Sequence, residues 1–186
     1  IKLTIATNSG NKIREDVGTE YTSDEILVTA GSSEALGIVL QAVVDSDEEV
    51  LLPDPSYIAY EPAIRLAGGL PVRLPTSQEG NWIPDPEIVR ESVTGRTKAI
   101  IVPSPCNPTG TVYPRKTIEQ LAEIAKNHDL YVLSDEIYDK IVYDDSVHTS
   151  ISSLEGLRER TFLINGLSKT YAMTGWRVGY LACPKE

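Results

Sequence analysis

Short runs of apolar and β-branched residues alternate along the chain with segments whose apolar residues recur every three or four positions. The first pair is a strand-like run at residues 26–29 followed by a helix-like segment over residues 31–44. Ser32 or Ser33 is expected to cap the first turn of this helix with its hydroxyl group. The spacing places one apolar stripe on the helix, formed by Leu36, Val39, Leu40, Val43 and Val44.

The same alternation continues to the end of the chain. Further strands are predicted at residues 50–55, 98–105, 130–136, 161–165 and 176–183, and further helices at residues 58–67, 87–93 and 115–128. Repeated strand–helix–strand order is typical of α/β proteins in which helices cover both faces of a parallel sheet. The predicted fold is therefore a three-layer α/β/α architecture with a mostly parallel central sheet. The first ten residues fit this order poorly and are interpreted as a separate strand.

Composition and charge exclude several classes of partner. The chain has 17 Lys and Arg and 27 Asp and Glu, so its net charge is 17 − 27 = −10, which disfavours nucleic acid or an anionic membrane as the main partner. The two cysteines, Cys106 and Cys183, are too few for a disulfide framework or a metal cluster and favour a reducing, cytoplasmic compartment. No apolar run approaches the roughly 20 residues that a membrane-spanning helix needs.

Chemically active residues follow the predicted strands one after another. In α/β folds, ligands bind beyond the carboxyl ends of the parallel strands, so residues at these ends are expected to lie close together. The first group begins a predicted helix, where free N–H groups and the helix dipole favour an anion. In chain order the candidates are Gly31, Ser32, Ser33, Tyr57, Asn107, Asp135, Tyr138, Ser168 and Lys169.

Each of these features also has a purely structural explanation. Residues 31–33 can be a simple helix start, and residues 107–110 (N-P-T-G) alone are most often a turn. Tyr57 alone more often packs in a core than contacts a ligand, and a lysine after a strand commonly reaches solvent. A carboxylate at the end of an apolar strand, such as Asp135, needs a partner when it is buried. Because an anion cradle, an aromatic ring, an amide, a carboxylate, a phenol and an amine all collect at one edge, the combination indicates a ligand site.

The combination suits a phosphorylated aromatic aldehyde held as a Schiff base. Lys169 supplies the nucleophilic amine, and Asp135 faces a pyridine nitrogen, so that the ring stays protonated and accepts electrons. Asn107 and Tyr138 are candidate hydrogen-bond donors to the phenolate oxygen of the ring. Arg177 and the backbone N–H groups of residues 31–33 hold the phosphate.

Five motifs resemble, in the same order, those of the class I and II family of pyridoxal-phosphate-dependent aminotransferases, which have fold type I. They are A-G-S-S-E-A-L, P-D-P-S-Y, N-P-T-G, S-D-E-I-Y and G-L-S-K-T-Y-A-M-T-G-W-R-V-G-Y. The resemblance covers about residues 25–184, and the M-T-G-W-R stretch is most similar to the aspartate, aromatic and alanine subgroup. It implies pyridoxal 5′-phosphate as cofactor, a homodimer, and transfer of an amino group from an L-amino acid to a 2-oxo acid in amino-acid metabolism.

The resemblance also implies a role for each residue of the site. Lys169 forms the Schiff base and moves the proton, and Asp135 and Tyr138 are the other two residues expected to take part in catalysis. Many members have a serine three residues before the lysine, where this chain has Gly166, so Ser168 is the candidate that supplies the missing hydroxyl. The remaining cofactor contacts are Asn107 at the ring oxygen, Tyr57 stacked on the ring, and Gly31, Ser32, Ser33 and Arg177 at the phosphate.

By the same resemblance, residues 25–186 correspond to the large cofactor-binding domain, and residues 1–24 to an N-terminal remnant. The family's small domain, with an arginine that binds the substrate carboxylate, is expected to lie outside the 186 residues. Two alternatives stay open: a lyase or decarboxylase on the same scaffold, and a non-catalytic, cofactor-binding effector domain of a transcription regulator. A nucleotide-binding fold is less favoured, since neither G-x-G-x-x-G nor a P-loop motif occurs.

Overall fold

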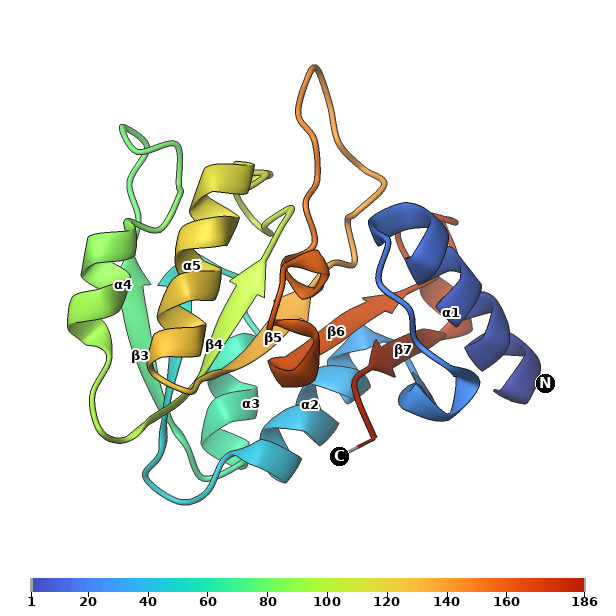
Figure 1. Ribbon diagram of the computed structural model, residues 1–186, viewed down its shortest axis with the longest axis horizontal. Coiled ribbons are helices and arrows are strands. Elements are labelled where there is room, and N and C mark those ends of the chain that lie inside the picture. Colours follow the sequence, from blue (N-terminus) through green and yellow to red (C-terminus); the bar gives the residue numbers. More distant parts are fainter. Residues whose placement is uncertain (1, 186) are drawn as a thin grey trace.

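A seven-stranded sheet with helices on both faces forms the computed structural model, which describes residues 2–185 (Figure 1). The predicted three-layer α/β/α fold is confirmed. Ile1 and Glu186, the outer limits of the two predicted domain ranges, lie outside the described residues. The strands are β1 (Ile26–Thr29), β2 (Glu49–Asp54), β3 (Leu70–Pro75), β4 (Thr97–Pro103), β5 (Tyr131–Asp135), β6 (Thr161–Gly166) and β7 (Gly179–Ala182). The helices are α1 (Lys2–Val17), α2 (Ser32–Val43), α3 (Tyr60–Leu66), α4 (Pro86–Ser92) and α5 (Arg115–Asn127).

Most neighbouring strands of the sheet are parallel, as predicted. The order is β1-β7-β6-β5-β4-β2-β3. Strands β3, β2, β4, β5 and β6 pair in parallel, whereas β7 pairs antiparallel with both β6 and β1. The carboxyl end of β1 therefore lies at the same edge as those of the parallel strands. Because β7 runs the opposite way, the residues that precede Gly179 reach this edge too.

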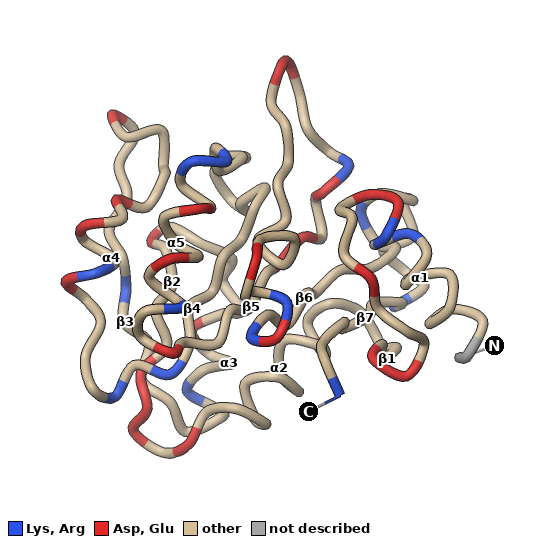
Figure 2. Tube along the Cα trace, viewed as in Figure 1, with Lys and Arg blue, Asp and Glu red and all other residues tan. Residues whose placement is uncertain are grey.

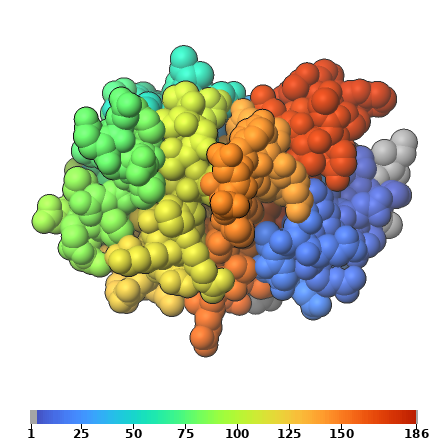
Figure 3. All heavy atoms as spheres, turned by 90° about the horizontal axis from the view of Figure 1, so that it is seen from above, coloured from blue at the N-terminus to red at the C-terminus, as the bar shows by residue number. Residues whose placement is uncertain are grey.

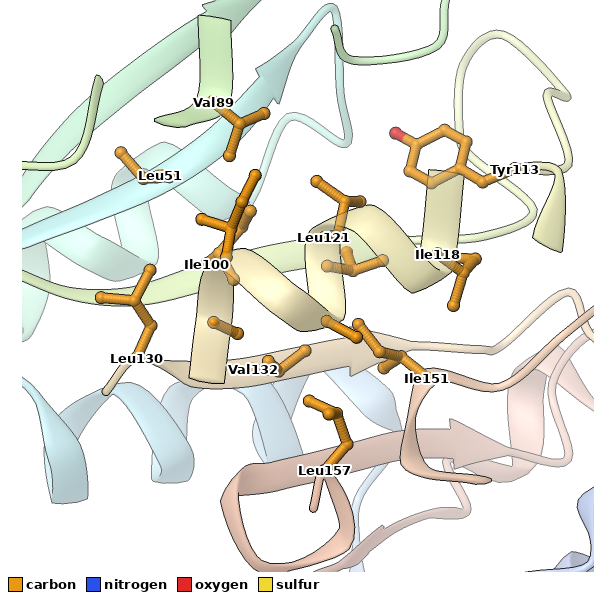
Figure 4. Packing of buried hydrophobic residues seen from close by; sticks show 14 of the residues in the cluster. Leu51, Val89, Ile100, Tyr113, Ile118, Leu121, Leu130, Val132, Ile151 and Leu157 are labelled. Carbon is orange, nitrogen blue, oxygen red and sulfur yellow. The ribbon is translucent and has the colours of Figure 1, made fainter. Parts of the chain in front are cut away.

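The core is divided between the two faces of the sheet. Helices α2 and α3 cover one face, and α1, α4 and α5 cover the other (Figure 1). Successive residues of β5 point to opposite faces, so Val132 packs with Ile118 and Leu121 of α5 (Figure 4), whereas Leu133 packs with the α2 and α3 side. Burial on both faces explains why the inner strands have nearly continuous apolar sequences.

Charged residues are interspersed over the helices and loops (Figure 2). Several form ion pairs with acidic residues that are largely buried, such as Arg96 with Glu49 at 2.5 Å and Arg158 with Glu25 at 2.6 Å. Within residues 2–185, the structure contains no helix that is both long enough and apolar enough to cross a membrane.

The strand predicted for the first ten residues is wrong, because the chain forms helix α1 from Lys2 to Val17. On the sequence alone, the first ten residues, I-K-L-T-I-A-T-N-S-G, fit poorly onto the helix-like segment that follows and are therefore interpreted as a separate strand. Ala6, Ile13 and Val17 instead recur at helical spacing and give α1 an apolar face. This face packs against Leu163 of β6 and Tyr180 of β7.

Two further expectations at the edge of the sheet are also wrong. Neither Ser32 nor Ser33 caps α2, since the N-cap residue is Gly31 and no side chain makes the capping bond. Instead, the Glu34 carboxylate accepts a hydrogen bond from the N–H group of Ala30. The last strand, predicted from residue 176, begins at Gly179, because residues 174–176 form a 3-10 turn and Arg177 has a left-handed backbone with φ 52°.

Three glycines bring the backbones of β6, β7 and α2 into direct contact. Gly166 lies opposite Gly179 in the β6–β7 pair. A Cβ atom on Gly166 would lie 2.8 Å from the carbonyl oxygen of Val178, so a side chain at this position would require the backbone to shift. A Cβ atom on Gly179 would overlap the backbone of Gly31 and Ser32. Glycine at these positions therefore lets the start of α2 lie directly on β7.

Gly179→Ala is expected to destabilise the protein by about 1–3 kcal/mol, because the added methyl group pushes the start of α2 away from β7. The matched control is Gly37→Ala on α2, where a Cβ atom would meet nothing within 4 Å. The control is expected to stabilise by about 0.5–1 kcal/mol, because alanine favours a helix interior. Urea denaturation measures both variants, and equal stability of the two would contradict the close approach of the backbones.

Candidate active site

A cavity of about 220 Å³ opens at the edge of the sheet where the parallel strands end. The structure brings nine of the ten predicted site residues together around it, and Gly31 lies next to it, beside Arg177. Ile137, Thr174, Pro105 and Tyr60, which the sequence did not single out, complete the lining. The predicted residues that line the cavity are Ser32, Ser33, Tyr57, Asn107, Asp135, Tyr138, Ser168, Lys169 and Arg177.

One end of the cavity is suited to an anion. The Arg177 guanidinium donates hydrogen bonds from Nη1 to the Thr174 carbonyl at 3.1 Å and from Nη2 to the Ala30 carbonyl at 3.3 Å. These bonds hold the guanidinium beside the first turn of α2, whose N–H groups carry the positive end of the helix dipole. A Cβ atom on Gly31 would overlap this guanidinium, so only glycine leaves room for it.

Lys169 lines the same cavity as Arg177 and Asp135. It follows β6 in an exposed turn, which is closed by a hydrogen bond of 3.1 Å from the Ala172 N–H to the Lys169 carbonyl. Its Nζ lies 5.3 Å from the centre of the Tyr138 ring, within the range of a cation–π contact. Ser168 is buried and lines the cavity, whereas Gly166 has no side chain to offer.

The carboxylate end of the cavity is formed by Asp135. Its Oδ2 accepts a hydrogen bond of 2.7 Å from the Tyr60 hydroxyl, and its Oδ1 accepts one of 3.3 Å from the Ile137 N–H. Burial raises the pKa of the Asp135 carboxyl; the bonds from Tyr60 and Ile137 lower it but do not cancel this effect, and the charge of Glu136 raises it further. A raised pKa means that the carboxylate lacks full compensation for its charge, so a cationic hydrogen-bond donor is its favoured ligand.

Among the four lining residues that the sequence analysis missed, Tyr60 is the one whose side chain hydrogen-bonds to Asp135. It is buried on α3, and its ring lies edge-on to that of Tyr57 at 5.6 Å and 84°. The available signal was the spacing of three residues between the two tyrosines, which places both side chains on one side of a helical turn. Only the packing of α3 beneath the end of β5 shows that the hydroxyl meets Asp135.

Asn107 and Tyr57 lie half-buried in the loops after β4 and β2. The turn that carries Asn107 is closed by two backbone hydrogen bonds, from the Gly110 N–H to the Cys106 carbonyl at 2.7 Å and from the Cys106 N–H to the Thr111 carbonyl at 2.9 Å. The amide side chain is therefore presented on a fixed backbone.

Asp135→Asn is expected to stabilise the cofactor-free protein at neutral pH, because it removes a buried carboxylate whose pKa is raised. The unfolded carboxyl titrates near pKa 3.8 and the folded one above it, so the folded state binds more protons between these values. The stability of the unsubstituted protein therefore falls as the pH rises through this window, and the advantage of the variant appears there and persists above it.

Thermal unfolding of the cofactor-free protein from about pH 3 to about pH 8 measures this difference. The matched control is Asp145→Asn, which changes an exposed carboxylate in the loop after β5. A difference between Asp135→Asn and the unsubstituted protein that stays constant with pH would contradict a raised pKa of Asp135.

Comparisons with known proteins place the chain in a family. Residues 6–186 match the family model described as aminotransferase class I and II. An aspartate aminotransferase of Pyrococcus abyssi is 48% identical over 160 residues, which cover 86% of this chain and 41% of the relative. A bifunctional aspartate aminotransferase and glutamate/aspartate-prephenate aminotransferase of Petunia hybrida is 46% identical over 95% of this chain and 37% of its own length.

Solved structures give the same result. An aromatic aminotransferase from Pyrococcus horikoshii matches with a TM-score of 0.94 and 43% identity, over 98% of this chain and 48% of the other. An aspartate aminotransferase from Thermus thermophilus with maleate matches with a TM-score of 0.94 and 41% identity, over 99% and 47%. The chain thus spans less than half the length of these relatives. By its sequence and its fold, it belongs to the class I and II aminotransferase family.

Proposed function

We propose that these residues form the cofactor-binding part of a pyridoxal-5′-phosphate-dependent transaminase that moves an amino group from an L-amino acid to a 2-oxo acid. The observation that carries the proposal is the arrangement of Lys169, Asp135 and Arg177 around one cavity in a chain of the aminotransferase family. The names of the relatives support amino acids such as aspartate or an aromatic amino acid as substrates. Residues 25–186 are the proposed large domain, and a homodimer in the cytoplasm is proposed with it.

The residues around the cavity fit the chemistry of this cofactor. Asp135 has a raised pKa and few compensating bonds, so a protonated pyridine nitrogen would satisfy its carboxylate. Arg177 and the first turn of α2 would hold a phosphate, and the space between them depends on glycine at position 31. Lys169 supplies the one primary amine that lines the cavity among the described residues, and this amine suits an aldehyde.

Each remaining residue has a role that follows from its place. When bound, the cofactor supplies an electron-accepting ring that stabilises negative charge on the substrate α-carbon. Lys169 would bind the cofactor covalently and, once released, take up and return a proton at Nζ, while the adjoining ring of Tyr138 limits where Nζ moves. The other contacts would come from Asn107 and Tyr138 at the ring oxygen, Tyr57 on the ring face, and Ser32, Ser33 and Ser168 at the phosphate.

Lys169→Ala in the full-length protein is expected to abolish the visible absorbance band of the lysine-bound cofactor. Transamination should fall by about 10²- to 10⁴-fold, because the group that transfers the proton is lost. Lys116→Ala, which changes an exposed lysine on α5, serves as the control and should keep both the band and the activity. The measurements are an absorbance spectrum after cofactor addition and a keto-acid-dependent amino-transfer assay.

Three results would contradict the proposal. The first is full activity of Lys169→Ala, and the second is an unsubstituted protein that shows no visible band with the cofactor. The third is release of ammonia, pyruvate or carbon dioxide without amino transfer, which would indicate a lyase or decarboxylase instead.

A further inference from the structure

One buried carboxylate outside the cavity joins three segments of the chain. Asp139 directly follows Tyr138 and is 7% exposed. Its Oδ2 accepts a hydrogen bond from Lys12 Nζ of α1 at 2.9 Å, and its Oδ1 accepts one from the Thr170 hydroxyl at 3.3 Å. Thr170 directly follows Lys169. The two oxygens of one carboxylate therefore connect the Lys169 turn to helix α1. Lys12 and Asp139 themselves are 127 positions apart in the chain.

The charges around Asp139 compensate one another. Lys12 also pairs with Asp16 at 2.9 Å, and Asp16 pairs with Lys140 at 2.6 Å. Burial lowers the pKa of the Lys12 ammonium, but the hydrogen bonds to Asp139 and Asp16 and the negative charge of Asp139 outweigh this effect and raise the pKa above its usual value. Lys12 therefore stays charged, and the cluster contains two ammonium groups and two carboxylates.

The carboxylate holds two turns that carry residues of the cavity. Tyr138 is in the first turn, which is closed by a hydrogen bond of 2.8 Å from the Ile141 N–H to the Tyr138 carbonyl. Lys169 is in the second turn. Figure 3 shows the segment after β5, in orange, beside α1 in blue. These two turns carry Lys169 Nζ and the Tyr138 ring, which lie 5.3 Å apart.

We propose that Lys12, Asp139 and Thr170 are positioning residues that fix the Lys169 turn against the Tyr138 turn, so that α1 supports the active site. The proposal rests on the proposed function only for the role of Lys169. These three residues keep residues 167–173 ordered in the protein without cofactor. A side chain is held in a productive position when the groups that carry it are themselves locked by hydrogen bonds.

The experiment compares Thr170→Val with Thr170→Ser. Valine has nearly the shape of threonine but lacks the hydroxyl, whereas serine keeps the hydroxyl and loses only a methyl group. In the cofactor-free protein, Thr170→Val is expected to raise hydrogen exchange of residues 167–173 by about three- to ten-fold, the effect of losing one hydrogen bond. Thr170→Ser should restore the protection, and exchange in β4 should stay unchanged in both variants.

Lys12→Met tests the connection from the other end. It is expected to raise exchange of the same residues 167–173 by about ten-fold or more, because it leaves the Asp139 carboxylate buried without its ammonium partner. Lys116→Met on the exposed face of α5 is the control and should leave this segment unchanged. If Lys12→Met does not fold, the comparison of the two Thr170 variants decides.

Unchanged hydrogen exchange of residues 167–173 in Thr170→Val would overturn the proposal. The same holds if exchange is as fast in Thr170→Ser as in Thr170→Val. In the full-length enzyme, Thr170→Val should lower kcat several-fold with KM for the amino acid unchanged, and Thr170→Ser should restore kcat. If the full-length enzyme has no transaminase activity, the proposed function fails, but the exchange data on the cofactor-free protein still decide whether Asp139 fixes the Lys169 turn.

Discussion

The direct contact between the backbone of Gly179 and the first residues of α2 determines how the ligand site is assembled. It places the start of α2, with Ser32 and Ser33, against the beginning of β7. Strand β6 reaches the edge at Gly166, the chain turns through Lys169, and β7 returns from the same edge after Arg177. One excursion of the chain therefore supplies both an amine and a guanidinium, and the antiparallel direction of β7 keeps both groups at the edge where the parallel strands end.

Two buried carboxylates in one segment differ in function: one is suited to bind a ligand, and the other is suited to hold turns of the chain in place. Among the described residues, Asp135 receives hydrogen bonds only from neutral donors, Tyr60 and the Ile137 N–H, and burial raises the pKa of its carboxyl. Asp139, four positions later, forms an ion pair with Lys12, so its negative charge is balanced by an ammonium group within the protein. The incomplete compensation of Asp135 leaves free energy to be gained from a cationic ligand, whereas the compensated Asp139 is suited to hold turns in place.

A third carboxylate, Glu136, lies between them and holds the backbone of this segment. Glu136 is 2% exposed and accepts hydrogen bonds from Ser134 at 2.7 Å and from Ser150 at 2.6 Å, and its Oε2 lies 3.1 Å from His148 Nε2. These bonds fix the backbone between Asp135 and Tyr138 from the side opposite the cavity. A fixed backbone suits an incompletely compensated carboxylate, because such a group gains solvation by turning towards water.

The sequence by itself determined the fold class, most element boundaries and most of the residues at the edge of the sheet. Apolar runs and helical spacing specify strands and helices, and parallel strands necessarily end at one edge, so Asn107, Asp135 and Lys169 were predicted to meet without knowledge of their contacts. Only the tertiary structure decided that the first residues form α1, that Tyr60 meets Asp135, and that Lys12 reaches Asp139. These contacts join residues 75 and 127 positions apart, and they depend on how helices pack on the sheet, which the periodicity of one segment does not specify.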